Sequence, residues 1–153
     1  MNSETGKQPQ PDNPAGHMIT FIANSGQPMR NGQQVDLATL KVNTNNGIKL
    51  VKNLTEADQL TIPLLVDHDP SLTAQAGNVV KLTLADKGLE ATARLADTDA
   101  ARLVWNLAQA DALTNSFSIT VTGNLANSVI RNGELTEISV VYLGMDAKAV
   151  YVS

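Results

Sequence analysis

The sequence predicts a mainly β domain with one or two helices, folded as a small closed β-barrel. Short apolar stretches alternate with turn signals, and Asn-Gly pairs, a strong hairpin signal, occur at Asn31-Gly32, Asn46-Gly47 and Asn132-Gly133. A long helical pattern occurs in one stretch only, near residue 100. Because an open sheet of many short strands would expose unpaired edges, we expect the sheet to close on itself.

Composition limits the class of protein. The 153 residues suit one domain, and with 42% hydrophobic but only 3% aromatic residues the core must consist mostly of Val, Leu, Ile and Ala. The net charge is −4 and the eleven basic residues are scattered, which argues against binding to nucleic acid or to an anionic membrane. Cysteine is absent, which excludes disulfides, a thiol nucleophile and a thiolate zinc site. We find neither a secretory signal nor an apolar stretch long enough to span a bilayer.

Residues 1–17 are rich in Gln, Pro, Asn, Ser and Gly and lack apolar periodicity, so we expect a flexible N-terminal tail. Residues 18–153 form the single predicted domain. Its predicted strands cover residues 18–23, 35–42, 47–51, 62–68, 78–85, 89–96, 115–122, 127–131, 134–143 and 147–152.

Three local patterns define the remaining elements. Asp97 or Thr98 caps a helix over residues 98–112, whose apolar stripe includes Ala101, Val104, Leu107 and Ala108. A weaker helical turn begins at Thr55, and Asp86-Lys87-Gly88 is a further turn between two alternating arms.

His68 is the first candidate for chemistry. It ends the apolar run Leu64–Val66 just before Pro70, and on a strand it would share a face with the core while its neighbours Asp67 and Asp69 point away. One interpretation is a partly buried structural histidine; the other is a general base. A metal site is not expected, because adjacent strand residues diverge and the other histidine, His17, lies in the tail.

Ser116 is the candidate nucleophile. In the strand over 115–122 it shares one face with Ser118, Thr120 and Thr122, while the opposite face is apolar. Such a face is often merely solvated, but a serine held on a strand beside a histidine base can attack a carbonyl group.

Glu137 is the preferred acid to orient the histidine. It alternates with the apolar residues of the strand over 134–143 and leaves their face together with Ser139. A solvated carboxylate is the competing interpretation.

The order of five segments resembles a known family. Leu64–Pro70, Gly77–Val79, the helix start at Asp97-Thr98, Ser116–Ile119 and Glu137–Val141 follow one another as in the prohead (capsid maturation) serine proteases of tailed bacteriophages. That family is similar in fold to the herpesvirus maturation protease, a small β-barrel. The likeness covers roughly residues 54–152.

The resemblance implies a serine endopeptidase with Ser116 as nucleophile, His68 as base and a variable third member, for which Glu137 lies on the family's Glu-x-Ser-x-Val strand. It implies cleavage of capsid and scaffold proteins, including itself, inside the phage procapsid in the host cytoplasm. A homodimer or other homo-oligomer is expected, with no cofactor, nucleic acid or membrane. The chain would then be the protease domain alone or an autolytically trimmed form.

Two departures keep alternatives open. Relatives often carry glycine two residues after the nucleophile, where this chain has Ser118, so Ser118 is a rival nucleophile; Leu143–Asp146 also lacks the family's proline and asparagine. The alternative functions are a catalytically inactive, protease-like barrel that acts as a capsid assembly or scaffold module, and a different small barrel that binds a ligand or peptide.

Overall fold

The computed structural model describes residues 13–153, which form one curled nine-stranded sheet and one α-helix. The strands are β1 (Met18–Asn24), β2 (Gln34–Val35), β3 (Lys41–Thr44), β4 (Gly47–Leu50), β5 (Ile62–Val66), β6 (Gln75–Ala85), β7 (Gly88–Leu95), β8 (Phe117–Ala126) and β9 (Val129–Val140). The helix α1 covers Asp99–Gln109, and three 3-10 turns cover Leu37–Thr39, Val51–Asn53 and Leu72–Ala74. The mainly β class with one helix is confirmed.

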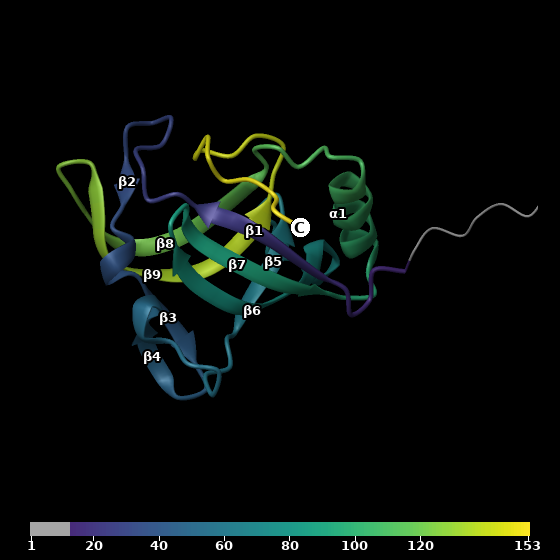
Figure 1. The fold of residues 1–153 in the computed structure, drawn as a ribbon, viewed down its shortest axis with the longest axis horizontal. Coiled ribbons are helices and arrows are strands. Elements are labelled where there is room, and N and C mark those ends of the chain that lie inside the picture. Colours follow the sequence, from purple (N-terminus) through teal and green to yellow (C-terminus); the bar gives the residue numbers. More distant parts are fainter. Residues whose placement is uncertain (1–12) are drawn as a thin grey trace, which may run out of the picture.

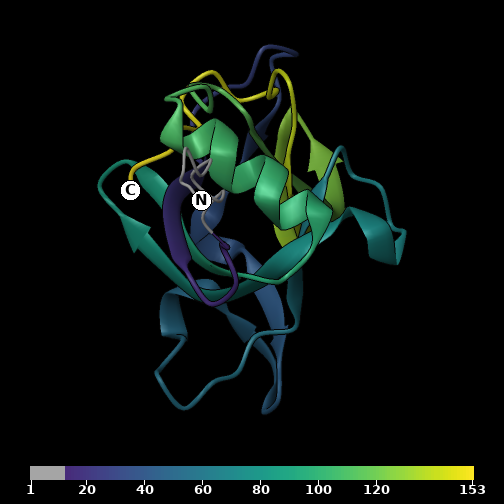
Figure 2. The same ribbon diagram turned by 90° about the vertical axis from the view of Figure 1, so that its right-hand side faces the viewer.

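The sheet is organised around β9. The strand order is β1-β7-β6-β5-β9-β3-β4, and β2 and β8 also pair with β9. The pairs of β9 with β2, β3 and β5 are parallel, whereas β8 and β9 form an antiparallel hairpin. Figure 1 shows the β3–β4 hairpin and α1 at opposite ends of the curled sheet, and in Figure 2 α1 crosses in front of one end.

The predicted closed barrel is wrong, because β1 and β8 are not hydrogen-bonded to each other. The edge of β1 that faces away from β7 is instead hydrogen-bonded to residues 150–153. The Ile22 N–H donates to the Val150 carbonyl at 2.8 Å, and the Val152 N–H donates to the Thr20 carbonyl at 2.8 Å. The open seam is bridged inside the sheet by stacked rings of Phe21 and Phe117, with centroids 4.1 Å apart. Packing across the seam thus replaces a ladder of backbone hydrogen bonds.

The helix forms where it is expected but is shorter. The Thr98 side chain accepts a hydrogen bond from the Ala101 N–H at 3.0 Å, and the buried stripe includes Ala101, Val104 and Ala108. The helix ends at Gln109 because Asp111 adopts a left-handed φ of 56°.

Turn chemistry explains the other differences. The predicted hairpin at Asn132-Gly133 is wrong: Asn127 and Ser128 make the β8–β9 turn with φ of 52° and 63°, and Asn132 lies inside β9 at a bulge. The predicted strand over 35–42 is interrupted by the 3-10 turn at Leu37–Thr39, and the strands over 127–131 and 134–143 are one strand, β9. The hairpins at residues 44–47 and 85–88 are confirmed.

Residues 13–17 of the predicted flexible tail are tied to the domain, and the rest of that tail lies outside the described residues. The Gly16 N–H donates to the Leu95 carbonyl at 2.9 Å, and the Leu95 N–H donates to the His17 carbonyl at 2.8 Å. The His17 ring also meets Trp105 of α1 edge-on at 4.6 Å. These contacts hold this short segment against β7 and α1.

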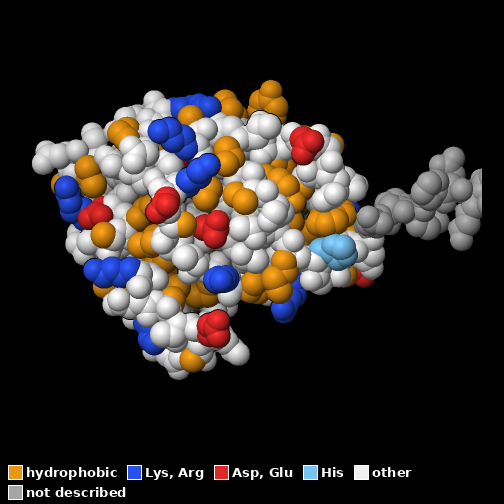
Figure 3. Space-filling view, in the orientation of Figure 1, with side chains coloured by type: hydrophobic (Ala, Val, Ile, Leu, Met, Phe, Trp, Pro, Cys, Tyr) orange, Lys and Arg blue, Asp and Glu red, His pale blue; other side chains and the backbone are white. Residues whose placement is uncertain are grey.

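The surface has mixed charge. On the face shown in Figure 3 the basic and acidic side chains are interspersed. Within residues 13–153, no helix is long and apolar enough to cross a membrane, and no group of three or more His, Asp or Glu is arranged to hold a metal ion.

Candidate active site

His68 does not lie on a strand face, because β5 ends two residues before it. Val66 is the last strand residue, and Asp67 and His68 both adopt left-handed backbone conformations, with φ of 58° and 55°. The Asp67 N–H still donates to the Val140 carbonyl at 2.9 Å, so the chain leaves β5 while attached to β9. The expected placement of His68 on the core face of a strand over 62–68 is therefore wrong, and the imidazole is 38% exposed.

The turn places the His68 ring over the β8–β9 hairpin. In that hairpin Ser118 pairs with Ser139 and Thr120 pairs with Glu137. Strand alternation buries Phe117 and turns Ser118 and Thr120 to the outer face of the sheet. The Ser118 hydroxyl oxygen lies 2.9 Å from His68 Nε2, within hydrogen-bond range.

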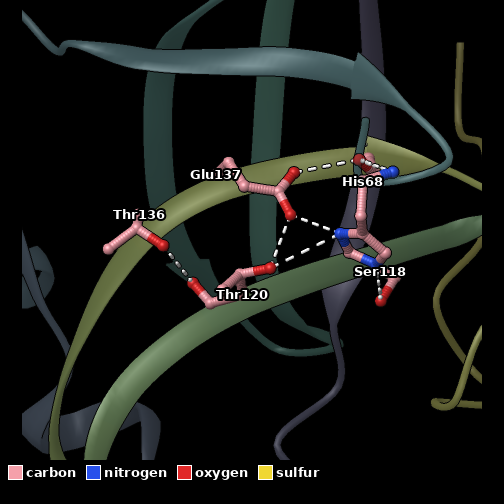
Figure 4. Close-up of polar contacts among 6 residues, drawn as sticks. His68, Ser118, Thr120, Thr136 and Glu137 are labelled. Carbon is pink, nitrogen blue, oxygen red and sulfur yellow. Dashed lines mark hydrogen bonds and ion pairs between the residues drawn. The ribbon is translucent and has the colours of Figure 1, made fainter. Parts of the chain in front are cut away.

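The other ring nitrogen meets a carboxylate. His68 Nδ1 is hydrogen-bonded to Glu137 Oε1, and the Glu137 side chain is only 13% exposed (Figure 4). Because an ionised carboxylate can only accept, Nδ1 carries the proton in the neutral ring and leaves Nε2 to accept from Ser118. The three groups are therefore arranged in the order serine, histidine, acid, with the histidine in the tautomer whose Nε2 can accept a proton from the serine hydroxyl.

Two further hydroxyls hold the carboxylate. Thr120 Oγ1 donates to Glu137 Oε1 at 2.5 Å, and Ser139 Oγ donates to Glu137 Oε2 at 2.9 Å. Thr120 Oγ1 also lies 3.4 Å from His68 Nδ1 (Figure 4). These interactions leave Glu137 oriented toward the imidazole.

The structure places Ser118, rather than the expected Ser116, against His68. Ser116 precedes β8, is buried, and uses its carbonyl to accept from the Val141 N–H at 2.8 Å. No hydrogen bond joins Ser116 to His68 anywhere in residues 13–153. The two serines share a strand face in sequence, but the β5–β9 pairing and the left-handed turn set the histidine opposite the second one, which corrects the expected pairing.

Sequence reasoning also missed what Thr120 and Ser139 do. In the sequence both are polar residues that alternate with apolar ones, as solvated strand residues do. Their spacing, two residues after Ser118 and two residues after Glu137, was the available signal. It became informative only once the strand register was known.

A groove of about 270 Å³ runs beside β8. Ser118 and Thr120 line it, together with apolar side chains that include Met29, Val35 and Met145. Within the described chain β8 pairs with β9 alone, so its other edge is not hydrogen-bonded to a strand. The groove therefore lies along the unpaired edge of β8, with Ser118 among its lining residues.

Polar contacts hold the segments next to the lining residues Met29, Met145 and Asp146. Arg30 donates to the Gly144 carbonyl at 3.2 Å and to Asn115 Oδ1 at 2.6 Å. The buried Asp146 accepts from the Ser25 hydroxyl at 3.0 Å. A side chain at Gly144 would put its Cβ 2.5 Å from the Phe117 carbonyl oxygen, so this segment packs directly on β8.

The sequence matches no family model and no curated protein. The fold is similar to that of the Kaposi's sarcoma-associated herpesvirus protease. One crystal structure of that enzyme, in complex with a hexapeptide phosphonate inhibitor, superposes with a TM-score of 0.53 at 11% identity, over 88% of this chain. A second, with an allosteric inhibitor, gives 0.47 at 12% identity, over 88% of this chain and 74% of that one. This chain spans 63% of the length of the first, and the likeness concerns the fold.

Proposed function

We propose that the protein is a serine peptidase in which Ser118 is the nucleophile, His68 the general base and Glu137 the acid that orients the histidine. The observation that carries the proposal is a pair of hydrogen bonds: His68 Nε2 with the Ser118 hydroxyl, and His68 Nδ1 with the Glu137 carboxylate. The herpesvirus protease fold supports it, since the similar enzyme is a protease that binds a peptide phosphonate.

The chemistry follows the order of these contacts. Ser118 Oγ attacks the peptide carbonyl carbon and passes its proton to His68 Nε2, and Glu137 stabilises the resulting imidazolium. His68 then protonates the leaving amine as the carbon–nitrogen bond breaks, which leaves an acyl group on Ser118. Water, deprotonated by His68, releases the acid and restores the serine hydroxyl.

The groove beside β8 suits an extended peptide. A bound segment would present its backbone to the unpaired edge of β8 and its side chains to Met29, Val35 and Met145. Backbone N–H groups then stabilise the oxyanion, an interaction that contributes about 3–4 kcal/mol per donor in known enzymes.

We further propose capsid maturation as the biological setting. The substrates would be capsid and scaffold proteins of a tailed phage, including the protein itself, cleaved by a homo-oligomer inside the procapsid in the host cytoplasm. Two findings support this setting: the order of sequence segments around His68 and Glu137, and a fold similar to that of a viral protease.

Active-site labelling tests the proposal. Ser118 Oγ should attack the phosphorus of a peptide diphenyl phosphonate, with one phenol leaving and the phosphonyl group staying on Ser118. Intact-mass measurement detects this stable adduct, and fragment-ion sequencing should place it on Ser118 rather than Ser116. Ser118→Ala should abolish labelling, whereas Ser116→Ala, the matched control, should retain it. Absence of an adduct on the folded wild type would favour the alternative, an inactive assembly module; an adduct on Ser116 would overturn the choice of nucleophile.

A further inference from the structure

Ser139 lies at the point where the three strands of the site meet. On the central strand β9 it pairs with Leu65 of β5 on one side and with Ser118 of β8 on the other. The residue is completely buried, with 0% exposure. Its hydroxyl therefore lies next to both the turn at Asp67-His68, which follows β5, and strand β8, which carries Ser118.

This hydroxyl makes two contacts at once. Ser139 Oγ accepts a hydrogen bond from the His68 backbone N–H at 2.9 Å and donates to Glu137 Oε2 at 2.9 Å. A serine hydroxyl has one proton to donate, and here the proton goes to the carboxylate while a lone pair receives the backbone N–H. One side chain thus connects the backbone of the base to the carboxylate that orients its ring.

The backbone at His68 needs such a partner. Asp67 and His68 both adopt left-handed φ values that residues with a Cβ rarely occupy, and such a turn persists only where its surroundings hold it. The His68 N–H bond to Ser139 is one such restraint, and it acts on the residue whose ring must reach Ser118.

We propose that Ser139 is a positioning residue that holds His68 and Glu137 in register with each other. This inference rests on the proposed function. Removing the hydroxyl frees the turn and one carboxylate oxygen together, so the ring loses both its backbone restraint and its fixed acceptor. The consequence is a slower reaction at Ser118 with little change in how the groove binds a peptide.

The kinetic test is saturation labelling with the peptide phosphonate, which separates the maximal rate of Ser118 modification from the apparent affinity. Ser139→Ala should lower the maximal rate about 10- to 100-fold, as loss of positioning contacts commonly does, and leave the apparent affinity within about twofold. Ser139→Thr, which keeps a hydroxyl, should recover most of the rate. In a Glu137→Gln background the effect of Ser139→Ala should shrink, because one of the two contacts of the Ser139 hydroxyl is with that carboxylate.

A matched control separates positioning from stability. Thr44 is another buried hydroxyl that accepts from a backbone N–H, that of Asn46 at 3.0 Å, and donates to a carbonyl, that of Gly47 at 2.7 Å, but it lies in the β3–β4 hairpin. Thr44→Ala should lower the unfolding temperature without changing the labelling rate. If Thr44→Ala slows labelling as much as Ser139→Ala, the loss reflects stability and the positioning role is overturned.

A second readout does not depend on activity. The chain has only two histidines, so ¹⁵N NMR of the imidazoles, assigned with a His17→Asn variant, reports the tautomer of His68 directly. Ser139→Ala should raise the fraction of the Nε2–H tautomer. An unchanged tautomer together with an unchanged labelling rate would overturn the inference. If wild type fails to label at all, the proposed peptidase function falls, while a tautomer shift would still support the positioning role.

Discussion

Replacing Glu137 by glutamine removes a charge from the site while preserving its shape. The amide has one acceptor and one donor end, whereas the carboxylate accepts from His68, Thr120 and Ser139. If the amide oxygen keeps facing Nδ1, a charge-assisted hydrogen bond becomes a neutral one, a loss of about 1–2 kcal/mol. That corresponds to a roughly 5- to 30-fold lower labelling rate at Ser118.

The opposite amide orientation has a larger effect. An N–H₂ group facing Nδ1 selects the tautomer that carries its proton on Nε2, which cannot accept from Ser118. In a chymotrypsin-type triad this exchange costs about 10⁴-fold. The assay is the second-order rate of phosphonate labelling, paired with ¹⁵N NMR of His68 to identify the tautomer, and the matched control is Glu134→Gln on the same strand. A Glu137→Gln rate within twofold of wild type, with an unchanged tautomer, would remove Glu137 from the mechanism.

Three other perturbations test separate parts of the molecule. His68→Ala should reduce phosphonate labelling to background without altering thermal unfolding, and residual labelling would point to another base. Gly88→Ala should destabilise the fold by more than ~2 kcal/mol in urea unfolding, because φ is +123° and the new Cβ would lie 2.3 Å from the Asn24 carbonyl oxygen. Hydrogen bonds from Asn46, then Lys49 and the Thr55 N–H, lower the pKa of Asp58 below its ordinary 3.8. The ionised Asp58 carboxylate therefore stabilises the folded state above about pH 4, and this stabilisation is lost as the pH falls. Asp58→Asn should accordingly flatten the fall in melting temperature below about pH 4. An unchanged slope of melting temperature against pH would contradict this.

Local signals in the sequence were sufficient for the elements that depend on neighbours in the chain. The cap at Thr98 and the apolar stripe after it define α1, and the turn before Gly88 defines the β6–β7 hairpin. The Asn132-Gly133 pair misled because its residues satisfy a bulge as readily as a hairpin turn. The expected closed barrel was wrong because the periodicity of apolar residues does not show which segment pairs with the edge of β1.

The candidate site was predictable as a set of residue types and not as a geometry. His68 and Glu137 were identified from their sequence context, and the structure brings them together. The choice between Ser116 and Ser118 depends on the register in which β5 and β8 pair with β9. That register is set by contacts between residues that are distant in sequence. Alternation assigns both serines to one face and cannot distinguish them.

The central position of β9 has a consequence for the order of events during synthesis. His68 is separated from Ser118 by 50 residues and from Glu137 by 69, and β9 is the common partner of β2, β3, β5 and β8. Until residues 129–140 leave the ribosome, β2, β3, β5 and β8 lack the strand they share as a partner, and the imidazole lacks the Glu137 carboxylate. A nascent chain therefore carries its histidine and serine as unconnected side chains, and any hydrolytic capacity appears only with translation of this late strand.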